Sequence, residues 1–295
     1  MLVLVTGSSS PWGRKLVSEL INNGRYLIRL LEHKTLVEQT GCEVYKGDVT
    51  DLSSMMDACA GVDVVIHMAG LSYSHRQQAY FEVNEGGTKN IVTACEKQSV
   101  DRLIHISSGA ATEKSGAYGV SKLRGEDLVR GCEGLRWVIL RPSEIYGPEM
   151  NEGIGQLLAW IDKYPWIPII GDGSYLLSPV YVDDVTNAIV RILNKKDLNE
   201  EILNLCGPEQ IAFTELVDRV AQTYKVSRRK VFVPIWIVKI SVYILTIVQT
   251  KFVFLDQIPR LINDKPQFLD KTRETLSYSP RTIEEGLHAL QSTNS

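Results

Sequence analysis

The chain has 295 residues, a hydrophobic content of 44% and a formal net charge of −3. This length can bury a full core, as one large or two modest domains, and the charge balance argues against nucleic-acid binding. Five cysteines occur singly, without a C-x-x-C pair. We therefore predict no disulfide framework, no metal site and a reducing, cytoplasmic location. The apolar N-terminal run is too short for a signal peptide.

The first predicted element is a short buried strand over residues 2–5, followed by a glycine-containing turn and a helix over residues 14–23. Free backbone N–H groups at such a helix start bind an anionic diphosphate, and glycines let the backbone approach it. The pattern sought is G-x-x-G-x-x-G, in which Ser10 here replaces the middle glycine; an ordinary strand-to-helix turn is the alternative. The candidate cofactor-binding residues are Gly7, Ser9, Ser10, Pro11, Trp12 and Gly13.

Acidic residues follow the next two predicted strands. Glu32 ends a strand over residues 26–31, where a carboxylate accepts hydrogen bonds from the adenosine ribose and repels a 2′-phosphate. We therefore favour NAD over NADP, although His33 and Lys34 would suit a phosphate. Asp48, in a third strand and turn over residues 44–49, is placed to reach the adenine amino group, with Val49 beside it.

Strands and helices continue to alternate through the first half of the chain. A helix is predicted at 53–59, a strand at 62–67, a helix at 83–98 that carries Asn84, and a strand at 103–108. This alternation predicts a mostly parallel, doubly wound α/β sheet with helices on both faces. Ligands of such sheets bind at the carboxyl ends of the strands. There, the small residues around Met68, Ala69 and Gly70 would let a cofactor lie close to the backbone.

Tyr118 and Lys122 are four residues apart in a predicted helix over residues 118–129, so their side chains share one helical face. A Lys ammonium in that position favours a phenolate over a phenol. The Ser108 hydroxyl, delivered by the preceding strand, can hydrogen-bond the same substrate oxygen. The three groups together suit proton transfer between an alcohol and a ketone; a surface Tyr–Lys pair is the alternative.

Several short motifs occur in a fixed order along the chain. They are Thr6-Gly7…Gly13, Gly47-Asp48-Val49, His67-Met68-Ala69-Gly70, Asn84, Ser107-Ser108, Tyr118-x-x-x-Lys122, Leu140-Arg141-Pro142…Tyr146-Gly147-Pro148 and Ser178-Pro179-Val180-Tyr181-Val182-Asp183-Asp184-Val185. In this order and at these spacings, the set resembles the extended short-chain dehydrogenase/reductase family, which comprises NAD-dependent epimerases, dehydratases and related dehydrogenases. The resemblance covers nearly the full chain.

This resemblance implies a role for each candidate residue. Tyr118 would be the general acid/base, and Lys122 would hold the nicotinamide ribose and favour the phenolate. Ser108 would orient the reacting oxygen, and Asn84 would support the site. The segment after the next strand would pass close to the nicotinamide amide, with Pro142, Ser143 and Ile145 as cofactor-binding residues.

The resemblance also implies a Rossmann fold with a smaller, mostly C-terminal substrate domain. Residues 1–148, with 179–206 returning to the sheet, would form the dinucleotide-binding domain, and residues 149–178 and 207–295 the substrate domain. Helices are expected at 151–163, 185–193 and 214–223, and strands near 165–173, 180–182 and 202–206. Sugar-nucleotide 4,6-dehydratases of the family carry Thr-Asp-Glu where this chain has Ser108-Gly109-Ala110, which argues against a dehydratase.

Two features of the second half bear on the substrate. Nucleotide-sugar enzymes of the family place an Arg on the substrate diphosphate, and Leu177 stands at that position; Arg141, Arg228, Arg229 or Lys230 would have to substitute. The segment 231–255 is largely apolar, but its unbroken part is shorter than the roughly 20 residues of a membrane span. We expect a buried or lipid-facing helix there, with peripheral membrane contact through residues 234–255 as an alternative. The membrane-associated 3β-hydroxysteroid dehydrogenase branch has a similar apolar helix.

Three interpretations follow. The favoured one is an NAD(P)-dependent epimerase or ketoreductase acting on a nucleotide-activated sugar. The second is a dehydrogenase acting on a hydrophobic alcohol, such as a sterol-like or polyprenoid lipid, and membrane-associated rather than freely cytoplasmic. The third is a non-catalytic cofactor-binding subunit, against which the intact Ser108, Tyr118 and Lys122 argue. Because family members pair through helices beside the sheet, a homodimer is also expected.

Overall fold

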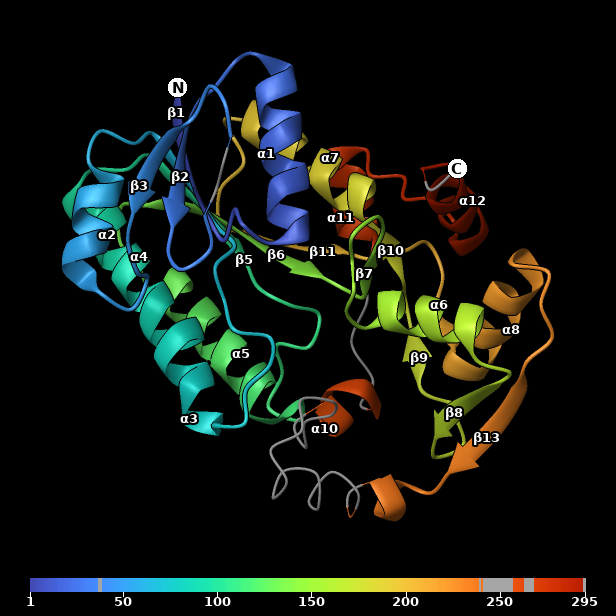
Figure 1. Ribbon diagram of the computed structural model, residues 1–295. Coiled ribbons are helices and arrows are strands. Elements are labelled where there is room, and N and C mark those ends of the chain that lie inside the picture. The colour runs from blue at the N-terminus through green and yellow to red at the C-terminus, as the bar shows by residue number, and fades with distance from the viewer. Residues whose placement is uncertain (37–38, 239, 241–256, 263–267, 294–295) are drawn as a thin grey trace.

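The computed structural model describes residues 1–36, 39–238, 240, 257–262 and 268–293. Up to β6, single strands are followed by helices, except that β3 comes directly after β2 in the element order (Figure 1). In chain order the elements are β1 Leu2–Thr6, α1 Pro11–Asn23, β2 Leu27–Glu32, β3 Glu43–Lys46, α2 Leu52–Cys59, β4 Val64–His67, α3 Gln77–Tyr80, a π-helical turn Phe81–Gly86, α4 Gly87–Lys97, β5 Arg102–Ile106, α5 Gly116–Arg130, β6 Arg136–Pro142, β7 Ile145–Tyr146, α6 Ile154–Lys163, β8 Trp166–Ile170, β9 Leu176–Leu177, β10 Val180–Tyr181, α7 Val182–Asn194, β11 Glu201–Leu205, β12 Ile211–Ala212, α8 Phe213–Thr223, β13 Arg229–Val233, α10 Gln257–Ile262, α11 Asp270–Leu276 and α12 Ile283–Thr293.

Seven parallel strands form the central sheet, in the order β11-β6-β5-β4-β1-β2-β3. The inner strands are almost uninterrupted aliphatic runs, because a parallel sheet covered by helices is buried on both faces. Val5, for example, pairs with Leu30 on one side and Ile66 on the other and is completely buried. The strand order reverses beside β1, which is where such sheets bind ligands. The predicted doubly wound α/β fold is confirmed.

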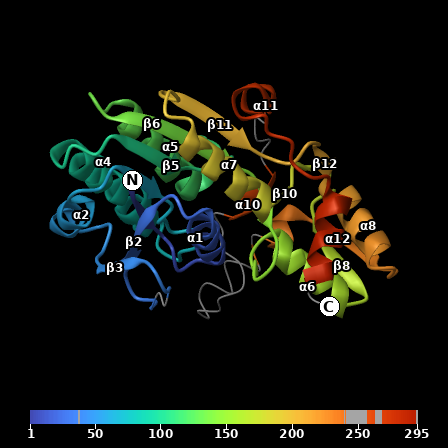
Figure 2. The ribbon, with the colours of Figure 1, turned by 90° about the horizontal axis from the view of Figure 1, so that it is seen from above.

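Helices cover both faces of this sheet (Figure 2). One layer packs α1, α7 and α11 against the sheet, through side chains such as Leu16, Ile189 and Leu276. The opposite layer packs α2, α4 and α5, through side chains such as Met55 and Ile91. The apolar residues of these amphipathic helices recur at helical spacing, so each helix buries one stripe against the strands.

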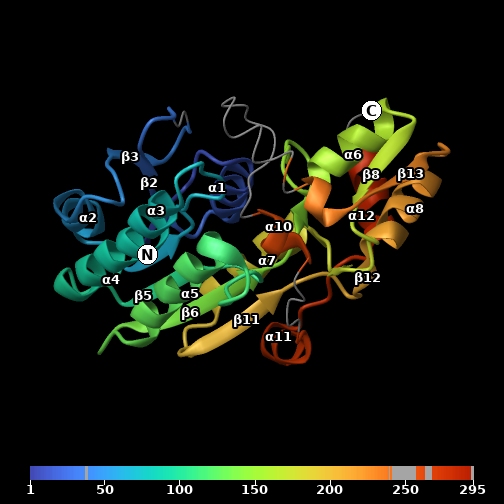
Figure 3. The same ribbon diagram turned by 90° about the horizontal axis from the view of Figure 1, so that it is seen from below.

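A smaller lobe with its own core lies beyond the carboxyl ends of the strands (Figure 3). It contains α6, α8 and α12 together with the parallel pair β8–β13. Two further strand pairs are short: the parallel pair β7–β10 joins residues 145–146 to 180–181, and the antiparallel pair β9–β12 joins residues 176–177 to 211–212. This arrangement places a cleft over the ends of β1, β4 and β5.

The structure differs from the sequence predictions at several element boundaries. Helix α1 begins at Pro11 rather than at Arg14, because Ser10 caps it by accepting a hydrogen bond from the Gly13 N–H at 3.0 Å and proline suits the first helical position. The first residues of the helix predicted at 83–98 instead belong to the π-helical turn Phe81–Gly86, which follows α3 and carries Asn84, and α4 begins at Gly87. Such turns are frequent at functional sites.

The C-terminal part shows two larger differences. Residues 231–233, which we expected to begin an apolar helix, instead belong to β13, where Val231 pairs with Pro168; β-branched and aromatic residues favour a strand. Residues 235–238 and 240 are helical, and most of the remaining apolar segment lies outside the described residues.

Residues 269–278 pack on the large sheet through Leu269 and Tyr278, whereas the predicted substrate domain included them. The predicted domain division is therefore corrected for residues 269–278, and the rest of it stays a proposal.

Candidate active site

Many of the residues singled out from the sequence line a cleft of about 880 Å³ between the sheet and the smaller lobe. The structure brings one set together on its wall and leaves another set outside. On the wall are Ser10, Pro11, Trp12, Met68, Gly70, Asn84, Ser108, Tyr118, Lys122, Pro142, Ser143 and Ile145. Not on the wall are Gly7, Ser9, Gly13, Glu32, Asp48, Val49 and Ala69.

Tyr118 and Lys122 lie one turn apart on α5 and both face the cleft. The Lys122 side chain is buried, and its Nζ donates a hydrogen bond to the Ile106 carbonyl at 2.7 Å, at the end of β5. Burial lowers the pKa of Lys122 to about 8, although the Glu126 carboxylate one turn further along α5 acts in the opposite direction. A large fraction of this amine is therefore still protonated at neutral pH, with its position fixed by the strand.

The ring of Tyr118 lies between two side chains. Tyr80 meets it edge-on with ring centroids 6.0 Å apart, and the guanidinium carbon of Arg260 lies 4.5 Å from its centroid. Arg260 also donates a hydrogen bond to the Ser72 carbonyl at 3.3 Å. Because Arg260 comes from α10, far along the chain, no local sequence pattern pointed to it.

The two serines after β5 have different surroundings. The Ser108 hydroxyl faces the cleft and accepts a hydrogen bond from the Ala110 N–H at 3.1 Å. The Ser107 hydroxyl instead donates to the fully buried Glu126. Glu126 also accepts two hydrogen bonds from Arg141, at 2.8 and 2.6 Å. A buried ionic network therefore fixes the end of β5 just behind the Ser108 hydroxyl.

This network removes Arg141 from the candidates for a substrate diphosphate. The other basic candidates are also elsewhere: Arg228 donates to the Ile161 carbonyl at 2.6 Å, and Lys230 pairs with Asp218 at 2.6 Å. None of these side chains, nor Arg229, lines the cleft. Leu177 is buried at the position expected for an arginine, and it does line the cleft.

Asn84 supports the loop that follows β4. Its amide oxygen accepts from the Leu71 N–H at 2.7 Å, and its amide nitrogen donates to the Leu71 carbonyl at 3.2 Å and to the Ser121 hydroxyl at 3.0 Å. These bonds connect the loop after β4 to helix α5. Asn84 therefore holds this loop in place beside the cleft.

The turn between β1 and α1 has no room for side chains at its two glycines. Gly7 has φ of +74°, and a Cβ there would lie 2.8 Å from the Ala69 backbone nitrogen. A Cβ on Gly13 would lie 2.3 Å from the Gly7 carbonyl oxygen. Ser10, in place of the middle glycine, donates to that same carbonyl at 3.0 Å while capping α1. The turn therefore keeps the close backbone packing of a diphosphate-binding loop.

Glu32 is the last residue of β2 and Asp48 follows β3, on the side of the sheet formed by β1, β2 and β3. Glu32 is largely buried, with the Lys46 ammonium 3.9 Å from its carboxylate. Asp48 pairs with His33 at 3.2 Å and accepts from the Thr50 N–H at 2.9 Å. Burial raises the pKa of Asp48, but the Thr50 hydrogen bonds and the nearby basic side chains outweigh it, so the pKa lies below its ordinary value.

Val49, Pro142 and Ser143, which were also predicted to bind the cofactor, are held by side-chain packing or by backbone hydrogen bonds. Val49 is buried and would contact a Cβ on Gly87 at 3.0 Å, so its side chain packs against α4. The Pro142 carbonyl accepts from the Gly109 N–H at 2.8 Å, and the Ser143 N–H donates to the Leu205 carbonyl at 3.0 Å. The first bond fixes the end of β6 against the loop that carries Ser108, and the second fixes the following segment against β11.

A buried histidine pair behind the site was not anticipated from the sequence. His67 and His105 lie at the ends of β4 and β5 with ring centroids 5.5 Å apart. Burial, with the Lys122 ammonium as the second cause, lowers the pKa of His67 to about 3. His67 shares hydrogen bonds with the Thr6 hydroxyl at 2.8 Å and the Thr88 hydroxyl at 3.3 Å. It is therefore a neutral part of the wall behind Lys122.

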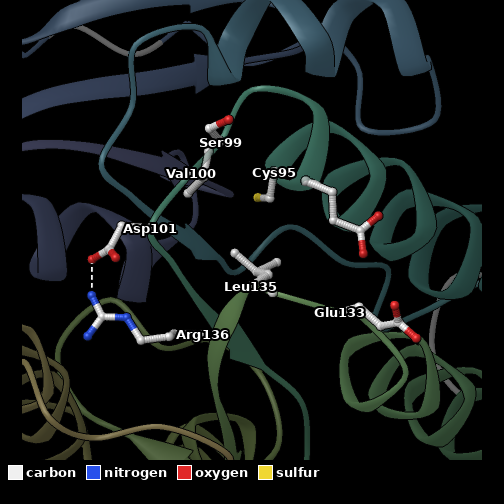
Figure 4. A pocket seen from close by; sticks show the side chains of 9 residues that line it. Cys95, Ser99, Val100, Asp101, Glu133, Leu135 and Arg136 are labelled. Atoms are coloured by element: carbon white, nitrogen blue, oxygen red, sulfur yellow. Dashed lines mark hydrogen bonds and ion pairs between the residues drawn. The ribbon is translucent and has the colours of Figure 1, made fainter.

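A second pocket, of about 580 Å³, lies near the amino ends of β5 and β6 and does not include these residues (Figure 4). Asp101 and Arg136 form an ion pair at its rim, and Cys95 and Leu135 point toward its interior. Among the described residues, no group of histidine, cysteine and acidic side chains could hold a metal ion. Within the same residues, no helix has both the length and the apolar character needed to cross a bilayer.

Comparisons with known proteins agree with this geometry. Residues 3–206 match the model of the NAD dependent epimerase/dehydratase family. The chain is 27% identical to the uncharacterised protein y4nG of Sinorhizobium fredii, over 65% of this chain and 53% of that protein. It is 28% identical to a ceramide reductase of Caulobacter vibrioides, over 79% of this chain and 74% of that protein. The chain thus spans about half the length of the first of these relatives.

The fold is also found in solved structures. MoeE5 in complex with UDP-glucose and NAD superposes with a TM-score of 0.80 at 21% identity, over 100% of both chains. This likeness covers the smaller lobe as well as the sheet. From the family match over the sheet-forming residues, together with the fold, the chain belongs to the NAD-dependent epimerase/dehydratase family of extended short-chain dehydrogenase/reductase enzymes.

Proposed function

We propose that this protein is an NAD(P)-dependent oxidoreductase that interconverts a secondary alcohol and a ketone on a predominantly apolar substrate. Tyr118 is the proton donor and acceptor, Ser108 orients the reacting oxygen, and Lys122 holds the nicotinamide ribose and supplies a positive charge beside the reacting groups. The dinucleotide, when bound, supplies the hydride acceptor or donor. The support is the meeting of these three side chains on one wall of the cleft.

The wall of the cleft that faces Ser108, Tyr118 and Lys122 indicates which class of substrate the cleft binds. The smaller lobe contributes an almost continuous apolar surface, made by Leu157, Trp160, Ile167, Ile170, Leu177 and Phe213. Among the described lining residues the cations are Lys122 and Arg260, whereas Glu144, Glu149 and Glu152 are acidic. These carboxylates would therefore repel a substrate diphosphate, and few cations would compensate for that repulsion. An apolar group of the substrate buried against this wall would instead be stabilised by about 25 cal/mol for each Å² of its surface removed from water.

A nucleotide-activated sugar, which the sequence pattern favoured, is the second candidate. It is supported by the likeness over the full chain to MoeE5, whose structure contains UDP-glucose and NAD. The lipid candidate is supported by the similarity to a ceramide reductase. Both candidates use the same three side chains, and they differ in what the smaller lobe binds.

A ligand screen, combined with substitution of Leu177, distinguishes the two candidate substrate classes. With dinucleotide present, we expect hydrophobic secondary alcohols or ketones to raise the melting temperature and to be turned over, because they bind the native state alone. Leu177→Arg should weaken this binding by about tenfold or more, through the lost apolar contact. The control is Leu176→Arg, since Leu176 is exposed and does not line the cleft. A shift with one nucleotide sugar alone would establish the second candidate, and turnover of no compound would favour a non-catalytic subunit.

We further propose that NAD is the preferred cofactor, through Glu32. The carboxylate is largely buried at the end of β2, where it would bind ribose hydroxyls and repel a 2′-phosphate. Glu32→Ala is expected to shift the NAD-to-NADP affinity ratio toward NADP by about tenfold, or about 1.4 kcal/mol. The ratio is measured by fluorescence titration of both reduced dinucleotides. Glu43→Ala is the control, because Glu43 lies at the amino end of the neighbouring strand β3, opposite Arg29 rather than Glu32; an unchanged ratio in Glu32→Ala would refute the assignment.

A further inference from the structure

The smaller lobe exposes large apolar and aromatic side chains next to basic ones. Phe232 on β13 is 54% exposed and Trp236, in the following helical residues, is 63% exposed. Together they belong to what we call the aromatic–basic surface, defined by Lys163, Tyr164, Trp166, Arg229, Val231, Phe232, Trp236, Ile237 and Ile240, all of them exposed. Several large exposed apolar side chains gathered in one part of a protein, rather than scattered singly, are typical of an interaction site.

Strand pairing and ring contacts hold this surface together. In the parallel pair β8–β13, Arg229 lies opposite Trp166 and Phe232 opposite Ile169. At the end of α6, the Trp160 ring contacts those of Tyr164 and Trp166, with centroids 4.9 and 5.5 Å apart. The two strands lie at the edge of the lobe, away from the seven-stranded sheet (Figures 1 and 3).

The charge pattern indicates what the surface binds. The sequence from 219 to 255 contains no Asp or Glu. Lys163 lies over the Tyr164 ring, with its Nζ 5.4 Å from the centroid, and Arg229 is exposed beside Trp166. Two acidic residues lie at this edge: Asp162, whose backbone carbonyl accepts a hydrogen bond from Arg228, and Asp218, whose carboxylate pairs with Lys230 of β13. Trp and Tyr rings favour the boundary between headgroups and hydrocarbon, and basic side chains are attracted to anionic lipids.

The same elements form the wall of the cleft. Trp160, Pro168 and Ile170, from α6 and β8, line the cavity, while Trp166 on β8 is exposed at the aromatic–basic surface. An apolar compound dissolved in a bilayer at this surface would therefore be close to the apolar wall of the cleft. Since no described helix could span a bilayer, contact would be interfacial.

We propose that the aromatic–basic surface binds the headgroup region of an anionic phospholipid bilayer and that the cleft takes its substrate from there. The part that concerns substrate supply rests on the proposed function. The surface itself does not, because binding to vesicles requires neither cofactor nor turnover. The two can therefore be tested separately.

The experiment is co-sedimentation of the full chain with vesicles of phosphatidylcholine and phosphatidylglycerol, and with vesicles of phosphatidylcholine alone. We expect binding to the anionic vesicles, weaker at high salt. The double substitution Phe232→Ser with Trp236→Ser should reduce the binding constant by about tenfold or more. Arg229→Gln should reduce it by about fivefold on anionic vesicles and leave binding to neutral vesicles unchanged.

Two further measurements show whether a loss of vesicle binding is specific to the aromatic–basic surface. Leu27→Ser removes an equally exposed apolar side chain from β2, 70% exposed and on the other lobe, and should leave vesicle binding unchanged. Trp fluorescence of the unaltered chain should shift to the blue on vesicles, and Trp236→Phe should remove most of that shift.

The proposal is overturned if the chain binds neither vesicle type, or if the double variant binds as well as the unaltered chain. It is also overturned if the surface instead joins two copies of the chain, seen as a dimer that the double variant dissociates and vesicles do not. Vesicle binding that is lost in the double variant, in a protein that turns over only soluble nucleotide sugars, would support the surface and refute the proposed substrate class.

Discussion

Replacing Tyr118 by Phe should lower kcat by about 10²- to 10⁴-fold, the usual contribution of a positioned acid or base, with dinucleotide binding nearly unchanged. The substitution removes only the phenolic oxygen. The remaining ring keeps its edge-on contact with Tyr80 at 6.0 Å and its place next to Arg260 at 4.5 Å. The proton needed to convert ketone to alcohol would then have no donor at the reacting oxygen.

The measurement compares kcat for the substrate found in the screen with the dissociation constant of the reduced dinucleotide. Tyr26→Phe is the matched control. Its hydroxyl donates to Asn194 at 3.0 Å outside the cleft, so the loss of this oxygen should not change turnover. Normal kcat in Tyr118→Phe would show that another group carries the proton.

Lys122→Met should lower kcat/KM by a similar factor of about 10²- to 10⁴-fold, and, unlike Tyr118→Phe, it should also weaken dinucleotide binding. The ammonium lies buried at the end of β5, bonded to the Ile106 carbonyl. Methionine fills the space without the positive charge that the ammonium supplies beside the reacting groups. Lys97→Met, at an exposed position in the last turn of α4, controls for the loss of a lysine. Equal dinucleotide affinity in the Lys122→Met and unaltered chains would contradict the ribose-binding role.

The same lysine gives the reaction a predictable pH dependence. Burial brings the pKa of Lys122 to about 8, so the ammonium is present below that pH and is lost as the pH rises through it. Activity should therefore fall above about pH 8. Glu126→Gln removes the carboxylate that raises the Lys122 pKa, so the fall should move to lower pH. An unchanged pH profile in Glu126→Gln would show that Lys122 does not set it.

The sequence alone predicted most of the nucleotide-binding half, because the evidence for it is local. Aliphatic runs such as 2–5 and amphipathic helices such as 14–23 are set by neighbouring side chains and their period. The four-residue spacing of Tyr118 and Lys122 likewise fixes their shared helical face. Boundaries were less accurate, as at Pro11, where a serine cap and a proline start the helix earlier than the apolar pattern suggests.

Local patterns failed where the environment of a residue depends on distant parts of the chain. Arg141 looked available for a phosphate, but Glu126 from another element binds it. The apolar pattern after Lys230 suggested a helix, but pairing with β8 makes its first residues a strand. Residues 269–278 were assigned to the smaller domain, but they pack on the large sheet.

The sequence by itself determined the family resemblance, the doubly wound sheet and the Ser–Tyr–Lys set, because each depends on residues close together in the chain or on strands that share one sheet. Only the tertiary structure decided what faces that set: Leu177 and the apolar wall of the smaller lobe, Arg260 beside the Tyr118 ring, and the exposed aromatic surface on β8 and β13. These features arise from packing between segments far apart in sequence. Spacing along the chain carries no information about such contacts.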